Sequence, residues 1–264
     1  MLSIMKHVRR KKLTQLTLSS IAKSIVLGSL LGDGCLRIYK GYKNAKFSIR
    51  HSNPQKEYLE WKVQKLRENE ITGTISEAKP DGFSLEKKWI FQSHVKTELT
   101  QIYDLTHKIR EKKLSIQRRW LNHLTPLALA IWWFDDGSLI CGRRRGVFCT
   151  DGFDQKSCLL LQAYLKSVCD VSVTVKPIYR KALNKSYYRL WLSTSQLQKL
   201  LRIILPEVPL VWDIFEKKMI IRYKNPDLQQ RWISELIEHL SVLENSRKYW
   251  IIQKLRERYS PILI

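Results

Sequence analysis

Two aspartates occupy matching places in the sequence, each at the end of a strongly apolar run and directly before a glycine. Asp33 ends the run 26–33, and Asp136 ends the run 129–136. Runs this apolar predict helices that are buried on most sides. The C-terminal end of a helix carries partial negative charge, so a lone carboxylate there is unfavourable. A divalent cation held by the two carboxylates would offset the repulsion, which makes both aspartates candidate metal ligands.

Such a site suits the hydrolysis of phosphodiester bonds. Divalent cations held by carboxylates activate water and stabilise the leaving oxygen, and this chemistry needs no nucleophilic Ser, Cys or His. The alternative for a single Asp-Gly pair is an ordinary turn at the end of a helix. Two such pairs, each closing a buried helix, favour metal binding over that alternative.

The composition points to a polyanionic partner. The chain carries 47 Lys and Arg against 24 Asp and Glu, a net charge of +23. A surface this positive repels itself when free, so nucleic acid is the first candidate partner. A membrane surface is the second, but no long apolar span supports it. The hydrophobic content of 44% argues against a disordered chain.

The cysteines and the N-terminus bear on the compartment. The five cysteines form no CxxC pair and no zinc-like spacing with the six histidines, which indicates reduced thiols inside a cell. The first 32 residues hold six Lys or Arg and no acid, as in some transit peptides. We interpret them instead as a basic arm, containing Arg9–Lys12, that leads into the first helix.

The segments after the first aspartate predict a sheet covered by helices. Alternating apolar and polar residues predict a strand pair at 36–39 and 46–50, with the apolar residues toward the core. The pattern then predicts a helix over 55–68, strands near 71–75 and 88–93, and a helix from 95. The polar face of the first strand pair is either a DNA-contacting surface or an ordinary solvated sheet face, and the residues alone leave both open.

The same order of elements returns after the second aspartate. Thr125 and Pro126 predict the start of its helix, as N-cap and first residue. Strands at 138–141, 147–150, 171–178 and 187–193 then alternate with helices over 154–168 and from 195. The aspartate precedes the end of the fourth strand by 60 residues in the first set and by 57 in the second. This near-constant offset indicates an internal duplication.

We therefore predict two domains. The first, 1–120, comprises the basic arm and one lobe, and the second, 121–264, comprises the other lobe with a C-terminal helical extension. The mixed apolar and basic tail from about 227 is expected to form a helix packed on the second lobe.

Five short stretches carry a resemblance to a known family. They are Leu-Gly-Ser-Leu-Leu-Gly-Asp-Gly at 27–34, Arg-His-Ser at 50–52, Gln-Lys-Glu-Tyr-Leu-Glu-Trp-Lys at 55–62, Leu-Thr-Pro at 124–126 and Trp-Trp-Phe-Asp-Asp-Gly-Ser at 132–138. The chain resembles the LAGLIDADG homing endonucleases, and within them the single-chain, two-repeat branch found in group I introns of organelles. The likeness covers about 21–204.

The resemblance implies an α+β fold of two pseudo-symmetric αββαββα lobes. Each lobe would present a saddle-shaped antiparallel sheet to DNA, with the two motif helices packed together between them. It further implies a monomeric, site-specific DNA endonuclease that cuts both strands of a long pseudo-palindromic target and leaves 3′ overhangs. The implied cofactor is Mg²⁺, in sites that Mn²⁺ or Ca²⁺ can also occupy.

Partners and location follow from the same resemblance. We expect double-stranded DNA as the main partner, intron RNA as a further one, no membrane, and a mitochondrion or chloroplast as the compartment. An RNA-binding group I intron maturase on the same fold is the alternative function. Intact Asp33 and Asp136 favour cleavage, since a protein that only binds has no need of them.

The resemblance also assigns the site residues. Asp33 and Asp136 match the metal ligands of the family, and the backbone carbonyls of the preceding Gly32 and Asp135 would contribute.

A lysine is expected near each scissile phosphate. Lys113 matches the position in the first lobe. In the second lobe the chain departs from the family pattern, so the position is open between Lys217 and Lys218, of which we choose Lys217.

The helix interface shows a second departure. Gly28 and Gly32 lie one turn apart in the first run and predict a close approach by another backbone. Gly28 aligns with Ile131 in the second run, so Ala128 or Ala130 is expected to supply the small surface there.

The predicted DNA contacts lie on the outward faces and tips of the two sheets, where cationic and polar side chains can reach phosphates and base edges. They are Arg37, Tyr39, Lys46, Ser48, Arg50, Arg143, Arg144, Arg145, Lys176, Arg180, Lys181, Tyr187 and Arg189. His51 is interpreted as a polar residue at a strand end, and Trp132 and Trp133 as core residues.

Overall fold

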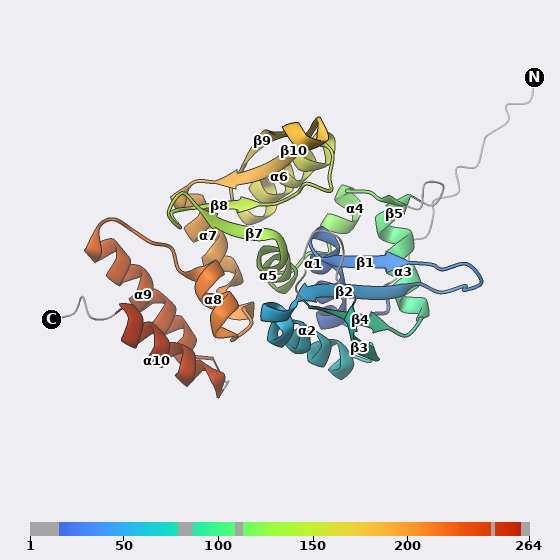
Figure 1. Cartoon of the computed structure of the whole chain (residues 1–264), viewed down its shortest axis with the longest axis horizontal. Helices are drawn as coiled ribbons and strands as arrows, with labels where there is room; N and C mark the ends of the chain where they lie inside the picture. The colour runs from blue at the N-terminus through green and yellow to red at the C-terminus, as the bar shows by residue number, and fades with distance from the viewer. Residues whose placement is uncertain (1–15, 79–86, 109–112, 244–245, 260–264) are drawn as a thin grey trace, which may run out of the picture.

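Two buried helices form the centre of the molecule. In the computed structural model, which describes residues 16–78, 87–108, 113–243 and 246–259, α1 (Ser20–Leu31) and α5 (Pro126–Asp136) pack side by side (Figure 1). The basic arm with Arg9–Lys12 lies outside the described residues. The long apolar runs form these helices because nearly every side chain in them is buried against one lobe or the other.

Both helices begin at side-chain caps. The Ser19 hydroxyl accepts a hydrogen bond from the Ala22 N–H at 3.1 Å and so caps α1. Thr125 caps α5 as predicted, accepting from the Ala128 N–H at 3.2 Å. The Thr125 hydroxyl also lies 2.7 Å from the Ser24 hydroxyl, which ties the two helices together near their N-termini.

The helices approach so closely that one position in α1, Gly28, and its C-cap, Gly32, admit only glycine. A Cβ on Gly28 would lie 2.4 Å from the Ala128 carbonyl oxygen and 2.8 Å from the Ile131 Cβ. A Cβ on Gly32 would lie 2.5 Å from the Asp135 Cβ. The predicted asymmetry of this interface is thus confirmed, with Ala128 as the small residue opposite Gly28.

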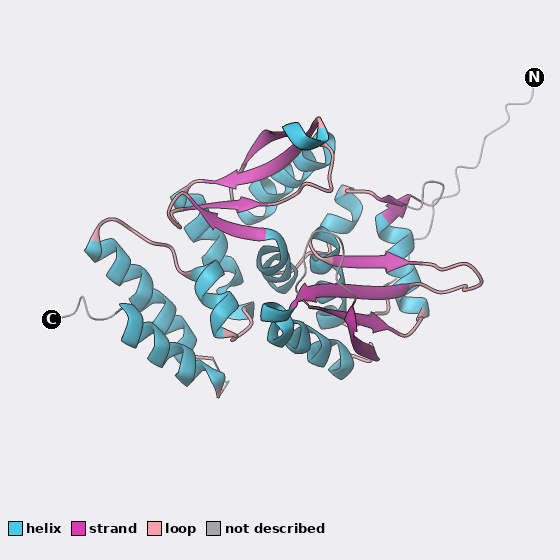
Figure 2. Cartoon of the chain, viewed as in Figure 1, coloured by secondary structure: helices cyan, strands magenta, loops and turns pink. Residues whose placement is uncertain are grey.

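Each repeat builds a four-stranded antiparallel sheet covered by helices (Figure 2). The first lobe continues from α1 through β1 (Gly34–Arg37), β2 (Lys46–Ser52), α2 (Lys56–Glu68), β3 (Gly73–Ala78), β4 (Lys88–Ser93) and α3 (Thr97–Thr106). The second continues from α5 through β7 (Gly137–Ile140), β8 (Arg145–Phe148), α6 (Gln155–Cys169), β9 (Thr174–Arg180), β10 (Lys185–Leu192) and α7 (Thr194–Ile204). Both lobes therefore have the predicted αββαββα order, and the α+β fold is confirmed.

The strand registers show how closely the two sheets correspond. The strand orders are β1-β2-β4-β3 and β7-β8-β10-β9. Gly34, which follows the first aspartate, pairs with Ile49, and Gly137, which follows the second, pairs with Phe148. His51 of β2 thus corresponds to Thr150, just beyond β8.

Short elements connect and extend the lobes. A two-stranded sheet of β5 (His107–Lys108) and β6 (Lys113–Leu114) and the helix α4 (Arg118–Leu121) lie between the repeats. The predicted division after residue 120 falls within α4. Single turns of 3-10 helix stand at η1 (Asn53–Gln55), η2 (Lys181–Leu183) and η3 (Leu205–Glu207).

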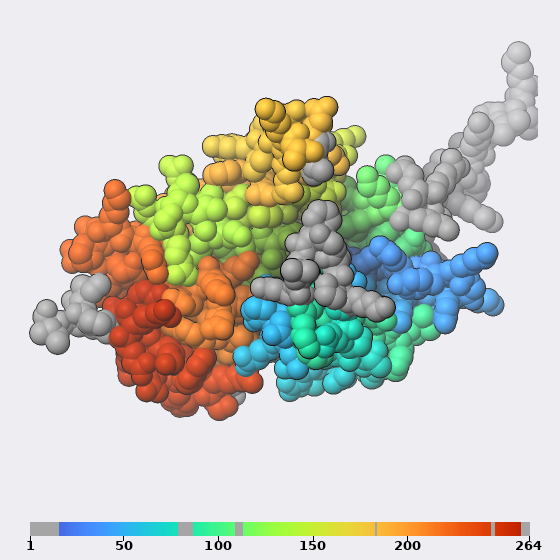
Figure 3. Space-filling model, viewed as in Figure 1, coloured from blue at the N-terminus to red at the C-terminus, as the bar shows by residue number. Residues whose placement is uncertain are grey.

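The C-terminal part is more elaborate than the sequence suggested. The expectation of one tail helix is wrong, because α9 (Pro226–Ser241) and α10 (Arg247–Tyr259) are separate helices that pack on each other. A further short helix, α8 (Trp212–Met219), packs on α5 and β7. The C-terminal helices form one end of the molecule (Figure 3), and Arg247 there pairs with Glu57 of α2 at 2.6 Å.

The core runs through both lobes and the C-terminal helices. Trp132 and Trp133 are fully buried, as predicted. The Phe148 ring stacks on the first of these indoles at 4.0 Å and meets the second edge-on at 5.2 Å. Among the helices that the structure describes, none is long and apolar enough to cross a membrane.

Candidate functional site

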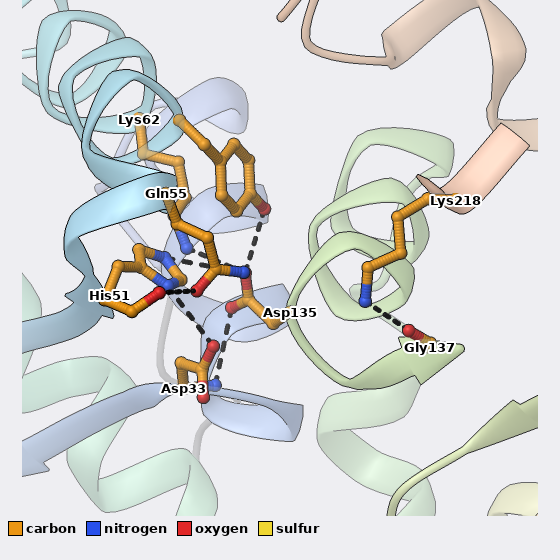
Figure 4. A network of polar contacts seen from close by, with 9 residues as sticks. Asp33, His51, Gln55, Lys62, Asp135, Gly137 and Lys218 are labelled. Atoms are coloured by element: carbon orange, nitrogen blue, oxygen red, sulfur yellow. Dashed lines mark hydrogen bonds and ion pairs between the residues drawn. The ribbon is translucent and has the colours of Figure 1, made fainter. Parts of the chain in front are cut away.

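Asp33, Asp135 and Asp136 lie where α1 and α5 end, and Figure 4 shows the first two beside His51 and Lys62. Burial, followed by the charge of Asp135, raises the pKa of Asp33 to about 6. Burial, followed by the charges of Asp33 and Asp135, raises the pKa of Asp136 to about 8. Each aspartate thus carries a cost for being charged, partly because the others are near. The sequence predicts that Asp33 and Asp136 lie together, and in the structure they are near enough for the charge of Asp33 to raise the pKa of Asp136.

The oxygens of Asp33 and Asp136 fit a hard divalent cation. The negative charge that they would carry is only partly compensated by nearby Lys62 and Lys218, both of which lower the pKa of Asp33. Carboxylate oxygens are the ligands that Mg²⁺, Mn²⁺ and Ca²⁺ prefer. A bound cation would therefore stabilise the charged forms of these side chains.

Lys218 is the lysine that α8 delivers to this site. Its ammonium donates a hydrogen bond to the Gly137 carbonyl, directly after Asp136, and its own carbonyl accepts from the Trp133 indole N–H at 3.0 Å. Burial lowers the pKa of Lys218, and the three aspartates oppose that shift. The neighbouring Lys217, chosen from the sequence, is exposed.

The lysine of the first lobe that reaches the carboxylates is Lys62 rather than Lys113. Lys113 is exposed on β6, where it lies opposite Lys108 of β5 in the strand register. Its charge acts on Asp154, whose pKa is lowered first by hydrogen bonds from Ser157 and then by these lysines. Lys62 of α2 is fully buried, and its ammonium lies 2.8 Å from the Asp135 carboxylate.

Asp135 is the most enclosed of the three acids. Its side chain and that of Lys62 are both 0% exposed. The Tyr58 hydroxyl donates to the same oxygen, Oδ1, at 2.9 Å. The other oxygen, Oδ2, accepts the Asp33 backbone N–H at 3.4 Å. The Asp135 side chain, which the second lobe carries, is therefore held by residues of the first lobe. The predicted role of its backbone carbonyl stays a prediction.

His51 completes the cluster around the first aspartate. Its Nδ1 lies 3.4 Å from Asp33 Oδ2, and its Nε2 lies 3.9 Å from Asp135 Oδ1. Burial lowers the pKa of this imidazole well below its usual value, so the ring is neutral near pH 7. Asp33, His51 and Asp135 each offer a ligand atom within 4.8 Å of the others. The Lys62 ammonium already neutralises Asp135, so a cation is better placed toward Asp33 and Asp136.

The sequence alone did not predict that the side chains of His51, Tyr58 and Lys62 lie at this site. One signal was present for the lysine. It lies four residues after Tyr58 and next to Val63, on the apolar face of α2, and a buried lysine needs an anionic partner.

The predicted DNA-contacting face of the first sheet has the expected alternation. Leu36, Phe47 and Ile49 are buried. The outward residues are exposed at Arg37, Tyr39 and Arg50 and half-buried at Lys46 and Ser48.

In the second sheet, one acidic residue pairs with two of the predicted DNA contacts. Lys176, Arg180 and Lys181 are exposed, and Tyr187 and Arg189 are half-buried. The Asp151 carboxylate accepts from Arg189 twice at 2.6 Å and from Arg180 at 2.5 Å. Both arginines therefore belong to an ion-pair cluster on this face.

The three predicted arginines around the β7–β8 turn differ in their surroundings. Arg143 donates to the Glu216 carbonyl and lies 3.8 Å from the Glu216 carboxylate, which fastens the turn to α8. Arg144 donates to the Cys141 carbonyl at 3.2 Å, and Arg145 is exposed.

Comparison with known proteins agrees with this architecture. Residues 23–200 match the model of the LAGLIDADG DNA endonuclease family. Paired αββαββα lobes with an aspartate at the end of each central helix define a two-repeat protein of this class. The chain belongs to the LAGLIDADG DNA endonuclease family.

Individual relatives are more distant. The chain is 25% identical over 175 residues to DNA endonuclease I-ChuI of Chlamydomonas applanata, which covers 61% of this chain and 78% of that protein. It is 28% identical over 197 residues to protein RecA of Mycobacterium gastri, which covers 69% of this chain and 43% of that protein. The chain therefore spans less than half the length of this RecA relative.

A solved structure shares the fold. The homing endonuclease I-WcaI bound to its DNA recognition sequence superposes with a TM-score of 0.63 at 19% identity, covering 76% of this chain and 87% of that one. At this identity the likeness concerns the fold alone.

Proposed function

We propose that this chain is a homing endonuclease that hydrolyses one phosphodiester bond in each strand of a long pseudo-palindromic DNA target and leaves staggered ends with 3′ overhangs. The observation that carries the proposal is the packing of α1 and α5 between two matched sheets, with Asp33 near enough to Asp136 for its charge to raise the pKa of Asp136. Membership of a DNA endonuclease family supports the same activity.

Asp33 and Asp136 are the residues that would hold Mg²⁺, with the carbonyls of Gly32 and Asp135 as further donors. A divalent cation in such a site supplies charge stabilisation at the phosphate and activation of the attacking water. Mn²⁺ or Ca²⁺ would bind the same oxygens.

Lysine side chains of the chain would add charge stabilisation at the phosphates. The Lys218 ammonium stabilises negative charge that develops at the reacting phosphate, because it lies in a poorly solvated site where charge interactions are strong. Lys113 and Lys217, both exposed, would contact phosphates further from the aspartates.

The two sheets would bind the duplex. Exposed cations such as Arg37, Arg145 and Lys176 would contact phosphates, so affinity should fall steeply with salt. Polar side chains on the strands would read base edges in the major groove. One chain with two sheets suffices for a target with two half-sites, so we propose a monomer. The group I intron origin and an organelle location belong to the same proposal.

The test uses the allele that lacks the coding sequence of this chain, with the flanking DNA joined. Purified protein and Mg²⁺ should cut a plasmid carrying that joined site and leave the matched plasmid with the interrupted allele intact. No cutting of either plasmid, together with tight binding of the surrounding intron RNA, would instead support the maturase alternative.

A further inference from the structure

A buried ion pair joins the two lobes beside the first aspartate. Lys62 comes from α2 of the first lobe, and Asp135 comes from the end of α5 in the second. Their charged atoms lie 2.8 Å apart with both side chains fully enclosed. The Tyr58 ring lies 4.4 Å from the ammonium, and its hydroxyl donates to the same carboxylate oxygen. This cluster exists only because two halves of a duplicated chain meet here.

The corresponding positions of the other half carry no such charges. By strand register, His51 corresponds to Thr150. When the Gln-Lys pair at the start of α2 is aligned with the one at the start of α6, Tyr58 corresponds to Cys158 and Lys62 to Gln162. The Thr150 hydroxyl and the Cys158 sulfur lie 3.5 Å apart, as His51 and Tyr58 are neighbours in the first lobe.

Gln162 does not reach across to the first lobe. Its amide donates to the Val173 carbonyl at 2.6 Å, and the residue equivalent to Asp135 is Gly32, which has no side chain to receive it. The ion pair is thus a feature of one half only.

The free carboxylate oxygen of the ion pair faces the first aspartate. Asp135 Oδ2 accepts the backbone N–H of Asp33 at 3.4 Å. That N–H lies in the turn between α1 and β1, so its direction governs where the Asp33 side chain points. His51, packed on Tyr58 at 5.1 Å between ring centres, bounds the Asp33 carboxylate on another side. Among the described residues, no hydrogen bond joins the Asp136 side chain to this cluster, and the cation that acts on Asp136 is Lys218.

We propose that Lys62 and Tyr58 are positioning residues for one half of the reaction: they fix Asp135 in place, and Asp135 in turn orients Asp33. This inference rests on the proposed endonuclease function. It follows that loss of the cluster slows cleavage of the strand served by Asp33 and leaves the strand served by Asp136 unchanged. The protein would become a nicking enzyme although the side chains of Asp33 and Asp136 are unchanged.

A double variant separates positioning from stability. Removing one member of a buried ion pair leaves an uncompensated charge, but replacing both members by apolar residues of similar volume is often neutral for folding. Lys62→Met combined with Asp135→Leu should therefore retain the thermal midpoint of the wild type and its affinity for target DNA. Gln162→Met is the matched control in the second lobe.

The assay follows both strands of a supercoiled plasmid that bears one target site, with the strands labelled separately. We expect the double variant to accumulate nicked circles, with one strand cut at the wild-type rate and the other slowed about 10- to 100-fold, as misplacement of a catalytic group by about 1 Å can cause. Gln162→Met should cut both strands like the wild type. A double variant that cuts both strands at the wild-type rate, or slows both equally, overturns the proposal.

Tyr58→Phe provides an independent check, because it removes one hydroxyl and keeps the ion pair. It should slow the same strand by a smaller factor, and equal slowing of both strands would again contradict the inference. A wild-type protein that cuts neither strand would overturn the endonuclease function itself, which distinguishes that failure from failure of the positioning role.

Discussion

The two lobes share an order of elements and a register, and they hold their aspartates by different means. Asp33 is surrounded by residues of its own lobe and by Asp135, with Lys62 as the compensating cation. Asp136 is approached by Lys218, which α8 supplies from outside the repeat. The duplication therefore preserved the two acids while the groups around them diverged. The comparison teaches that matching aspartates do not make matching surroundings.

The largest expected effect concerns the second half-site. Lys218→Met should lower the cleavage rate by about 10²- to 10³-fold, as loss of one preorganised charge at a reacting group does. Lys217→Met, one residue away and exposed, should change the rate by less than about 3-fold. Strand-resolved cleavage rates would check this contrast. Equal losses of cleavage rate in the two variants would contradict a catalytic role for Lys218.

The two aspartates should also differ in how they couple stability to pH. Burial and neighbouring carboxylates raise the pKa from 3.8 to about 6 for Asp33 and to about 8 for Asp136. A raised carboxyl pKa means that the native state holds a proton which the unfolded state releases. The free energy of unfolding therefore falls as pH rises from 3.8 to the folded pKa of each group.

Thermal midpoints across pH, without divalent cation, would resolve the two acids. Asp136→Asn should remove a decline in stability that continues to about pH 8, on the order of a few kcal/mol in total. Asp33→Asn should remove a smaller decline that is complete near pH 6 to 7. Mg²⁺ should raise the wild-type midpoint more at pH 8 than at pH 5, because it binds the charged forms. Superimposable pH profiles for all three proteins would contradict this account.

The smallest effect tests the contact between the lobes. Gly28→Ala would place a Cβ 2.4 Å from the Ala128 carbonyl oxygen, and overpacking of this kind costs about 1–3 kcal/mol. Gly152→Ala is the control, because a Cβ there meets nothing within 4 Å, and its effect should stay within about 0.5 kcal/mol. Urea unfolding measures both. A neutral Gly28→Ala would mean that the helices can move apart without loss.

Much of the fold follows from local pattern. The apolar runs, the cap at Thr125 and the alternation at Leu36 to Ile49 each reflect short-range chemistry, and the repeated offset linked them into two lobes. The C-terminal helices were harder to predict, because α8 is short and follows Pro206 and Pro209, so its role depends on packing against α5 rather than on its own periodicity.

The candidate site was predictable only where the proposed metal ligands follow the ends of their own helices. Asp33 and Asp136 were placed together because the helices carrying them had to pack. The contacts of Asp135 with Tyr58 and Lys62 join residues 77 and 73 positions apart. Periodicity shows which face of α2 is buried, but not which residue lies opposite that face. The same limit left Lys217 and Lys218 open until the end of α8 was placed beside Gly137.

The central claim is that Asp33 and Asp136 together form the cleavage site. The most direct measurement is strand-resolved cleavage of the joined-allele target in Mg²⁺ by wild type, Asp33→Asn and Asp136→Asn, with DNA affinity measured in parallel. We predict that the wild type cuts both strands and that each variant binds the target but does not linearise it. Linear product from both variants at the wild-type rate would contradict the account.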